Sequence, residues 1–284
     1  MLPALVIVFR EAIEAGLIVG IVLAATRGVP NRGLWVAYGV VAGVAGACAV
    51  AGFAGRLANL FHGTGQELFN ASVLGLAVLM LAWHNIWMSS HGRALAADLK
   101  KVGAAVASGE RTLTALAIVV GVAVLREGSE VVLFLYGIAS QGGTTQSAML
   151  VGGGLGLLGG GALSALMYLG LLAVPPGRLF AVTSALITLL AAGMASQATL
   201  FLQQAGYLNA LLTPLWDTSW LLPQEGPGIA GILGRMMHTL VGYTDSPDGA
   251  QLIAYAATVL AIGVLMQIAG RTHSRSHRAV PHAA

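Results

Sequence analysis

The chain has 284 residues, of which 57% are hydrophobic and only 9% are charged, and its formal net charge is +3. A soluble domain of this length would expose more polar surface than this composition supplies, so the sequence indicates a polytopic membrane protein. The basic residues are scattered over short loops and a polar tail, and this pattern argues against nucleic acid as a partner.

Seven stretches are apolar over the roughly 20 residues that a membrane-spanning helix needs. Between the sixth and the seventh, residues 203–249 are rich in Pro, Gly and Trp, and we expect an outer loop there with a short or re-entrant helix. The prediction is one all-α transmembrane domain over residues 1–270, followed by a cytoplasmic tail over 271–284. In chain order, the predicted spans cover about 3–26, 34–55, 68–89, 112–138, 148–174, 179–202 and 250–269.

The distribution of Lys and Arg between the loops predicts the orientation. With the N-terminus outside, ten basic residues lie on the inner side and only two, Arg56 and Arg235, on the outer side. The seven spans are therefore expected to run N-out and C-in. The ten inner residues are Arg27, Arg32, Arg93, Lys100, Lys101, Arg111, Arg178, Arg271, Arg275 and Arg278.

Two spans contain the same charged pentad, R-E-x-x-E: REAIE over 10–14 in the first and REGSE over 126–130 in the fourth. On a helix, two Glu at i and i+3 project toward one face, and an Arg four residues before the second Glu can pair with it. Each pentad therefore presents two carboxylates with their own guanidinium. The residues concerned are Arg10, Glu11, Glu14, Arg126, Glu127 and Glu130.

The energetic cost of these charges indicates what they face. One charge at the middle of a span costs about 2.5–3.5 kcal/mol even on the lenient insertion scale, so six of them must face one another, water or an ion. A purely structural network is the simplest explanation, but four carboxylates and two guanidiniums leave a charge of −2. Such a remainder takes up protons or binds a cation.

The two pentads lie at similar depths in spans of opposite direction. Residues of about 1–90 and 112–202 would then form an inverted repeat of helices 1–3 and 4–6, with helix 7 added, an arrangement in which substrate sites lie at the repeat interface. If helices 1 and 4 pack together, all four carboxylates meet. Carboxylate oxygens are hard ligands, so the predicted cargo is a di- or trivalent cation.

The paired pentads resemble the motifs of the oxidase-dependent iron permeases, the FTR1/EfeU family. The resemblance covers roughly residues 1–270 and includes the segments 66–83, 190–198 and 215–248. The family's usual spelling is R-E-G-L-E, so Arg and both Glu are kept here in each pentad. The resemblance implies seven spans and ferric-iron uptake across the plasma membrane. It makes the four Glu translocation ligands, oriented and neutralised by Arg10 and Arg126.

Further polar residues are weaker candidates. His84, Ser129 and Gln197 lie in predicted spans and are possible accessory ligands, although His84 equally suits an interhelical hydrogen bond near Trp83 and Trp87. Acidic residues predicted on the outer side can attract cations to an entrance, or can be ordinary solvated charges. They are Glu67, Asp217, Glu225, Asp245 and Asp248.

The leading hypothesis is a non-enzymatic iron (Fe³⁺) uptake permease of a bacterial inner membrane, with lipid around it and no permanently bound cofactor. The resemblance implies an iron-oxidising or periplasmic iron-binding partner protein. A competing hypothesis is a transporter of the same architecture for Fe²⁺, Mn²⁺ or Pb²⁺, because a charge of −2 does not select between valences. Two hypotheses of different classes are an intramembrane enzyme that uses the carboxylates and a structural membrane subunit.

Overall fold

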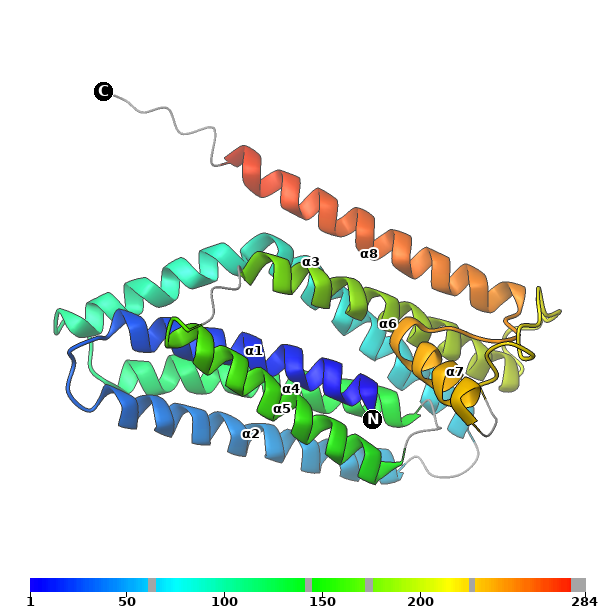
Figure 1. The fold of residues 1–284 in the computed structure, drawn as a ribbon, viewed down its shortest axis with the longest axis horizontal. Helices are drawn as coiled ribbons and strands as arrows, with labels where there is room; N and C mark the ends of the chain where they lie inside the picture. Colours follow the sequence, from blue (N-terminus) through cyan, green and yellow to red (C-terminus); the bar gives the residue numbers. More distant parts are fainter. Residues whose placement is uncertain (61–64, 141–144, 172–175, 225–227, 277–284) are drawn as a thin grey trace. The chain divides into compact units, whose positions relative to one another are not determined.

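The structure is a computed structural model that describes residues 1–60, 65–140, 145–171, 176–224 and 228–276 (Figure 1). In this part of the chain, every regular element is an α-helix, and the one β pairing is an isolated bridge between Pro214 and Asp248. The predicted all-α class is therefore confirmed. The helices are α1 (Leu2–Ala25), α2 (Arg32–Leu60), α3 (Gln66–Ala107), α4 (Thr114–Ser140), α5 (Gln146–Tyr168), α6 (Pro176–Gln204), α7 (Gly228–Val241) and α8 (Gly249–Ser276).

Two compact units divide the chain. The first unit comprises Met1–Gly63 and Arg93–Phe180, and the second comprises Thr64–Gly92 and Ala181–Ala284. Helices α1, α2, α4 and α5 thus belong to the first unit, whereas most of α6, with α7 and α8, belongs to the second. Both units receive part of α3.

Among the described residues, five helical segments are long and apolar enough to cross a membrane: 32–54, 66–88, 146–168, 181–204 and 249–269. Helices α1 and α4 match them in length but contain the charged pentads. The short helix expected within 203–249 is present as α7. The fifth helix ends at Tyr168 and not near 174 as predicted, because the chain turns at Gly170, whose φ of 73° is in the left-handed region that glycine adopts easily.

Helix α3 corrects one expectation. The predicted spans leave residues 90–111 as an inner loop, but α3 continues to Ala107. The apolar residues at Leu95, Leu99 and Val106 recur at helical spacing, and Leu99 and Val106 are buried in the core of the first unit. Charged side chains at Asp98 and Lys101 are exposed and pair with each other at 3.1 Å. This part of α3 is therefore an amphipathic helix that folds onto the first unit.

Helices α1 and α5 pack closely through small residues (Figure 1). Gly152, Gly156, Gly160 and Ser164 are the buried residues of α5, one on every turn of its helix. A Cβ added at Gly156 would lie 2.5 Å from the carbonyl oxygen of Leu5, so a larger side chain would force the two backbones apart. Small residues at this spacing allow helices in a membrane to approach closely.

Helices α2 and α4 pack in the same way. A Cβ at Gly39 would lie 2.6 Å from the carbonyl oxygen of Ala117, and one at Gly43 would lie 2.7 Å from that of Gly121. Contacts between α1 and α4 then join the two pairs. Ile18 and Val22 of α1 share one apolar cluster with residues of α2, α3 and α4. The two pentad-bearing helices are thereby fixed against each other.

The second unit contains its own close approach. Gly193 of α6 lies against Gly242, where a Cβ on Gly193 would be 2.5 Å from the Cα of Gly242. Gly242, with φ of 74°, lies just after α7 and begins the segment that leads to α8. Asp248 precedes α8, and its carboxylate accepts a hydrogen bond from the backbone N–H of Gln251 at 2.8 Å.

Candidate metal centre

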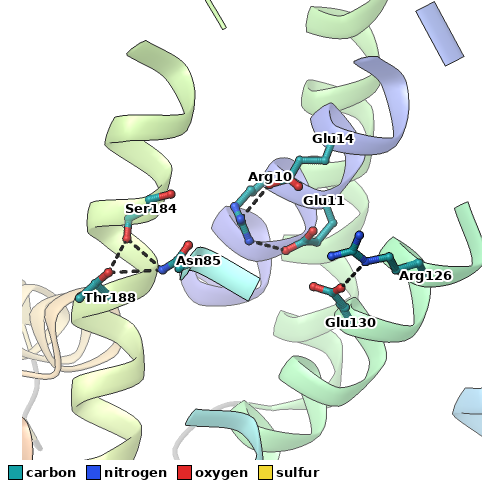
Figure 2. A network of polar contacts seen from close by, with 8 residues as sticks. All are labelled: Arg10, Glu11, Glu14, Asn85, Arg126, Glu130, Ser184 and Thr188. Carbon is teal, nitrogen blue, oxygen red and sulfur yellow. Dashed lines mark hydrogen bonds and ion pairs between the residues drawn. The ribbon is translucent and has the colours of Figure 1, made fainter. Parts of the chain in front are cut away.

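In the pentad of α1, both glutamates contact the arginine. Arg10 Nη1 donates to Glu11 Oε1 at 3.0 Å, and Nη2 forms an ion pair with Glu14 Oε1 at 2.8 Å (Figure 2). All three side chains are at most 2% exposed. The pair with Glu14 follows from the helix, because side chains four residues apart face each other. The long guanidinium side chain also reaches its neighbour Glu11.

In the pentad of α4, the arginine is more exposed. Arg126 Nε donates to Glu130 Oε1 at 3.1 Å, again at a spacing of four residues (Figure 2). The side chain of Arg126 is 35% exposed, compared with 2% for Arg10. Glu127 is buried, and an oxygen atom of its carboxylate lies within 4.8 Å of one of Glu11 in α1. Two carboxylates this close repel each other unless a proton or a cation lies between them.

Three of the four predicted glutamates converge in the first unit. Oxygen atoms of Glu11, Glu127 and Glu130 lie within 4.8 Å of one another, and all three residues are buried. Glu14 is not part of this group, because its carboxylate is directed to Arg10, although it remains close enough to interact electrostatically with Glu127. The four glutamates thus form a group of three carboxylates with a fourth held beside it by a guanidinium.

The donor atoms of this group are of the kind that hard cations prefer. Three carboxylates from two helices offer up to six oxygen atoms, and the four Glu with two Arg have a formal charge of −2. Arg10 interacts electrostatically with all four carboxylates. A buried excess of negative charge attracts a cation, and carboxylate oxygen favours ions such as Mg²⁺, Mn²⁺ or iron over the metals that prefer thiolate.

The accessory candidates belong to different units of the chain. Ser129 Oγ donates to the carbonyl oxygen of Leu125 in its own helix at 2.6 Å. His84 and Gln197 both belong to the second unit, where His84 is buried in α3 and Gln197 is half-buried in α6. A ligand role for these three residues stays a prediction.

The acidic residues predicted at an outer entrance also differ in environment. Glu67 and Asp217 are exposed, and hydrogen bonds from the side chain of Ser219 and from its backbone N–H, the latter at 2.9 Å, lower the pKa of Asp217. Asp245 is half-buried and accepts from the backbone N–H of Gln224 at 3.1 Å. Asp248 is buried and caps α8, so its carboxylate already has a structural role. Glu225 lies outside the described residues.

Two polar networks of the second unit were not identified from the sequence. Asn85 of α3 donates to the carbonyl oxygen of Ser184 at 3.4 Å and to Thr188 Oγ1 at 3.3 Å (Figure 2). Gln224 Nε2 donates to the carbonyl oxygen of Tyr243 at 2.9 Å and lies 3.1 Å from His238 Nδ1. An asparagine within an apolar run signals a buried partner, but its position on α6, about 100 residues away, has no local signature.

Five apolar spans, two further long helices with matching charged pentads, and a buried carboxylate group between those two helices together define a class. The chain is a multi-pass membrane protein with a buried group of carboxylates between two of its helices.

The comparisons with known proteins identify the family. The model of the iron permease FTR1 family matches residues 1–275, so the chain belongs to that family. Ferrous iron permease EfeU of Escherichia coli O6:H1 (strain CFT073) is 31% identical over 284 residues, which cover 97% of this chain and all of the relative. The protein of the same name from Shigella sonnei (strain Ss046) is 30% identical over 97% of this chain and all of the relative. No solved structure matches.

The resemblance inferred from the pentads is therefore confirmed at the level of the family. The relatives are permeases by name, which is consistent with a transporter and not an enzyme.

Proposed function

We propose that this protein imports iron as Fe³⁺, and that Glu11, Glu14, Glu127 and Glu130 are the ligands through which the ion passes. The observation that carries the proposal is the convergence of Glu11, Glu127 and Glu130, whose oxygen atoms lie within 4.8 Å of one another and are buried. Three carboxylates around one point repel one another unless protons or a cation separate them. Iron is the substrate here, and no resident cofactor is part of the proposal.

The proposed topology has seven spans, N-out and C-in, with α1–α3 and α4–α6 as inverted repeats and α8 as the seventh span. The packing of the first unit supports the repeat. Helix α1 packs on α5 and α4 packs on α2, while α1 and α4 contact each other. An axis between α1 and α4 that exchanges α1 with α4 and α2 with α5 would convert one packed pair into the other. Sites at such axes are common in transporters.

The chemistry then divides between the two arginines and the four glutamates. Arg10 keeps Glu11 and Glu14 in place through contacts of 3.0 and 2.8 Å, so the carboxylates are positioned before the ion arrives. Glu127 and Glu130 complete the oxygen ligands from α4. Exposed Glu67 and Asp217, if they lie on the outer side, raise the local cation concentration by long-range attraction. The ion moves by exchange of one carboxylate ligand for the next.

The second candidate function is import of Fe²⁺ by the same site. It is favoured by the name of the relatives, ferrous iron permease. Charge does not separate the two ions, because a site of −2 becomes neutral with Fe²⁺ and reaches only +1 with Fe³⁺. Uptake of radioactive iron in the presence of a strong reductant, compared with uptake of a ferric chelate, separates them. Fe³⁺ as the cargo predicts that the reductant lowers uptake.

We place the protein in a bacterial inner membrane, by analogy with the family to which it belongs. The family resemblance also suggests a partner that oxidises iron or delivers it on the periplasmic side. Iron that arrives already bound to such a partner would reach the site without hydrolysis in free solution.

The test of the proposed function is iron uptake in cells that lack other iron importers. We expect Glu14→Ala and Glu130→Ala to abolish uptake while the variants are still inserted in the membrane. Glu110→Ala is the matched control, because Glu110 is exposed in the turn after α3 and makes no part of the carboxylate group. Normal uptake by correctly inserted Glu14→Ala and Glu130→Ala variants would refute the carboxylate site.

A further inference from the structure

A cavity of about 600 Å³ lies within the first unit, next to the pentad of α1 but separate from it. Its walls come from three helices: the C-terminal half of α1, the end of α5 and the distal part of α3. On α1, the lining begins at Gly16, two residues after Glu14, and continues to Ala25. At about 30 Å³ for each water molecule, this volume corresponds to roughly 20 waters.

The cavity follows the same stripe of α1 as the carboxylate of Glu14. Leu17 and Ile21, three and seven residues after Glu14, line the cavity and lie on that stripe. Glu14 itself is buried and does not line the cavity. One helical turn therefore separates the glutamate group from the nearest wall of the cavity.

Gly16 of α1 and Ser164 of α5 meet at the wall of the cavity. A Cβ on Gly16 would overlap Ser164 Oγ, so the two helices touch at this point and leave no room for a larger side chain at Gly16. Ser164 is 8% exposed and lines the cavity. Within the part of the chain that the structure describes, its hydroxyl has no hydrogen-bond partner.

A buried hydroxyl without a partner is unfavourable, and hydrocarbon chains cannot supply one. Water or a hydrated cation can supply this hydrogen-bond partner. The orphan hydroxyl thus distinguishes a wet cavity from a groove filled by a lipid chain. Lys100, at the rim, is exposed, so its charge is largely screened by solvent. It does not prevent a cation from passing.

We propose that this cavity is the water-filled vestibule through which the ion leaves the glutamate site, and that Ser164 is the first oxygen ligand on the release side. The proposal rests on the proposed function for its ion and its orientation, in which the C-terminal half of α1 is cytoplasmic. Release requires a path to open along α1 between Glu14 and the cavity wall at Leu17. In the structure this path is closed, because Glu14 does not line the cavity.

The first test is chemical access, which does not depend on transport. In a Cys48→Ser background, which contains no other cysteine, Gly20→Cys and Ala24→Cys place thiols in the cavity. We expect a membrane-impermeant thiol reagent to modify both in inside-out vesicles and neither in right-side-out vesicles. Modification only by a membrane-soluble reagent would show a lipid-filled groove and would overturn the proposal. Modification only from the outer face would overturn the assignment to release.

The second test fills the cavity. A Cβ at Gly20 meets only Tyr168, at 3.8 Å, so Gly20→Leu occupies the cavity without breaking the helix contact. We expect loss of uptake with iron binding to the purified protein retained. Gly161→Leu is the control, because no atom lies within 4 Å of a Cβ at Gly161 and this residue does not line the cavity. Normal uptake by Gly20→Leu would overturn the route.

The third test concerns the hydroxyl. Ser164→Ala keeps the small side chain that Gly16 requires, so we expect unchanged thermal stability, an unchanged iron affinity and a lower maximum uptake rate. Wild-type uptake by Ser164→Ala would remove Ser164 as a ligand. If the wild-type protein imported no iron at all, the proposed function would fail, whereas the labelling result would still decide whether the cavity is wet and open to the inner side.

Discussion

The two pentads have the same charged residues at the same spacing but different surroundings. In α1, Arg10 is 2% exposed and contacts both glutamates of its pentad. In α4, Arg126 is 35% exposed and pairs with Glu130 at 3.1 Å, while an oxygen atom of Glu127 lies within 4.8 Å of one of Glu11 across the helix interface. The arginine of the first pentad is thus buried far more deeply than that of the second.

We infer from this difference that the two arginines have different roles. A guanidinium held by two carboxylates in a dry environment is a fixed part of the scaffold, since removing it leaves two buried charges without compensation. A guanidinium at the edge is screened by its surroundings and contributes less. We therefore expect the α1 pentad mainly to stabilise the site, and the carboxylates of the α4 pentad mainly to provide the negative charge that binds the ion.

Removal of each arginine tests this comparison most directly. We expect Arg10→Leu to lower the free energy of unfolding by about 3–5 kcal/mol, the usual effect of breaking a buried ion pair. Arg126→Leu should lower it by about 1 kcal/mol or less, because that side chain is partly exposed. Denaturant unfolding of the purified proteins in detergent measures both. Equal losses would show that the two pentads are equivalent.

The helix contacts behind the pentads give the next largest effect. A Cβ at Gly156 would lie 2.5 Å from the carbonyl oxygen of Leu5, and one at Gly43 would lie 2.7 Å from that of Gly121. We expect Gly156→Ala and Gly43→Ala each to destabilise the protein by about 1–3 kcal/mol through overpacking.

Gly154→Ala is the control for these substitutions, because a Cβ at Gly154 has open space around it. In a helix, Gly→Ala at such a position is expected to be neutral or slightly stabilising. Thermal unfolding of the three variants makes the comparison. If Gly43→Ala left the stability unchanged while Gly156→Ala lowered it, the α2 contact with α4 would be looser than the α1 contact with α5.

Iron affinity separates the glutamates. Glu127 belongs to the group of three close carboxylates, whereas Glu14 is engaged by Arg10. We expect Glu127→Gln to weaken iron binding at least about tenfold, which corresponds to about 1.4 kcal/mol. Glu14→Gln should weaken binding less but still reduce transport. Titration of the purified protein with iron gives the affinities, and a larger loss for Glu14→Gln would contradict the division of roles.

Much of this site could be predicted from local sequence. Charges inside an apolar run must be buried together, and helical spacing already placed Glu14 within reach of Arg10. The spacing of four residues predicted the pair of Arg10 with Glu14, but the sequence did not indicate whether Glu11 or Glu14 would join the α4 carboxylates. Both choices satisfy the spacing, and the packing of α1 against α4 decides between them.

The remaining fold shows the same limit. The spacing of Leu95, Leu99 and Val106 contained the signal for the helical extension of α3, which polar residues at Asp98 and Lys101 obscured. In contrast, nothing near Asn85 identifies Thr188 as its partner, because that contact depends on how α3 and α6 pack. Local periodicity predicts which face is buried, but tertiary packing determines what it meets.

The fourth residue of each pentad provides the smallest expected effect. It is Ile13 in α1, which is 1% exposed, and Ser129 in α4, whose hydroxyl donates to the carbonyl oxygen of Leu125 at 2.6 Å. Since that hydroxyl is satisfied within its own helix, Ser129→Ala should change stability by less than about 0.5 kcal/mol. Uptake and iron affinity should remain at wild-type values.

Ser129→Ile then gives the α4 pentad the residue that α1 has at this position. Unchanged iron affinity in both variants would show that the difference between the pentads lies in their surroundings and not in this residue. Loss of affinity in Ser129→Ala, with stability preserved, would instead make the hydroxyl an accessory ligand. Loss in Ser129→Ile alone would indicate that a larger side chain disturbs α4, because the alanine variant removes the same oxygen without adding volume.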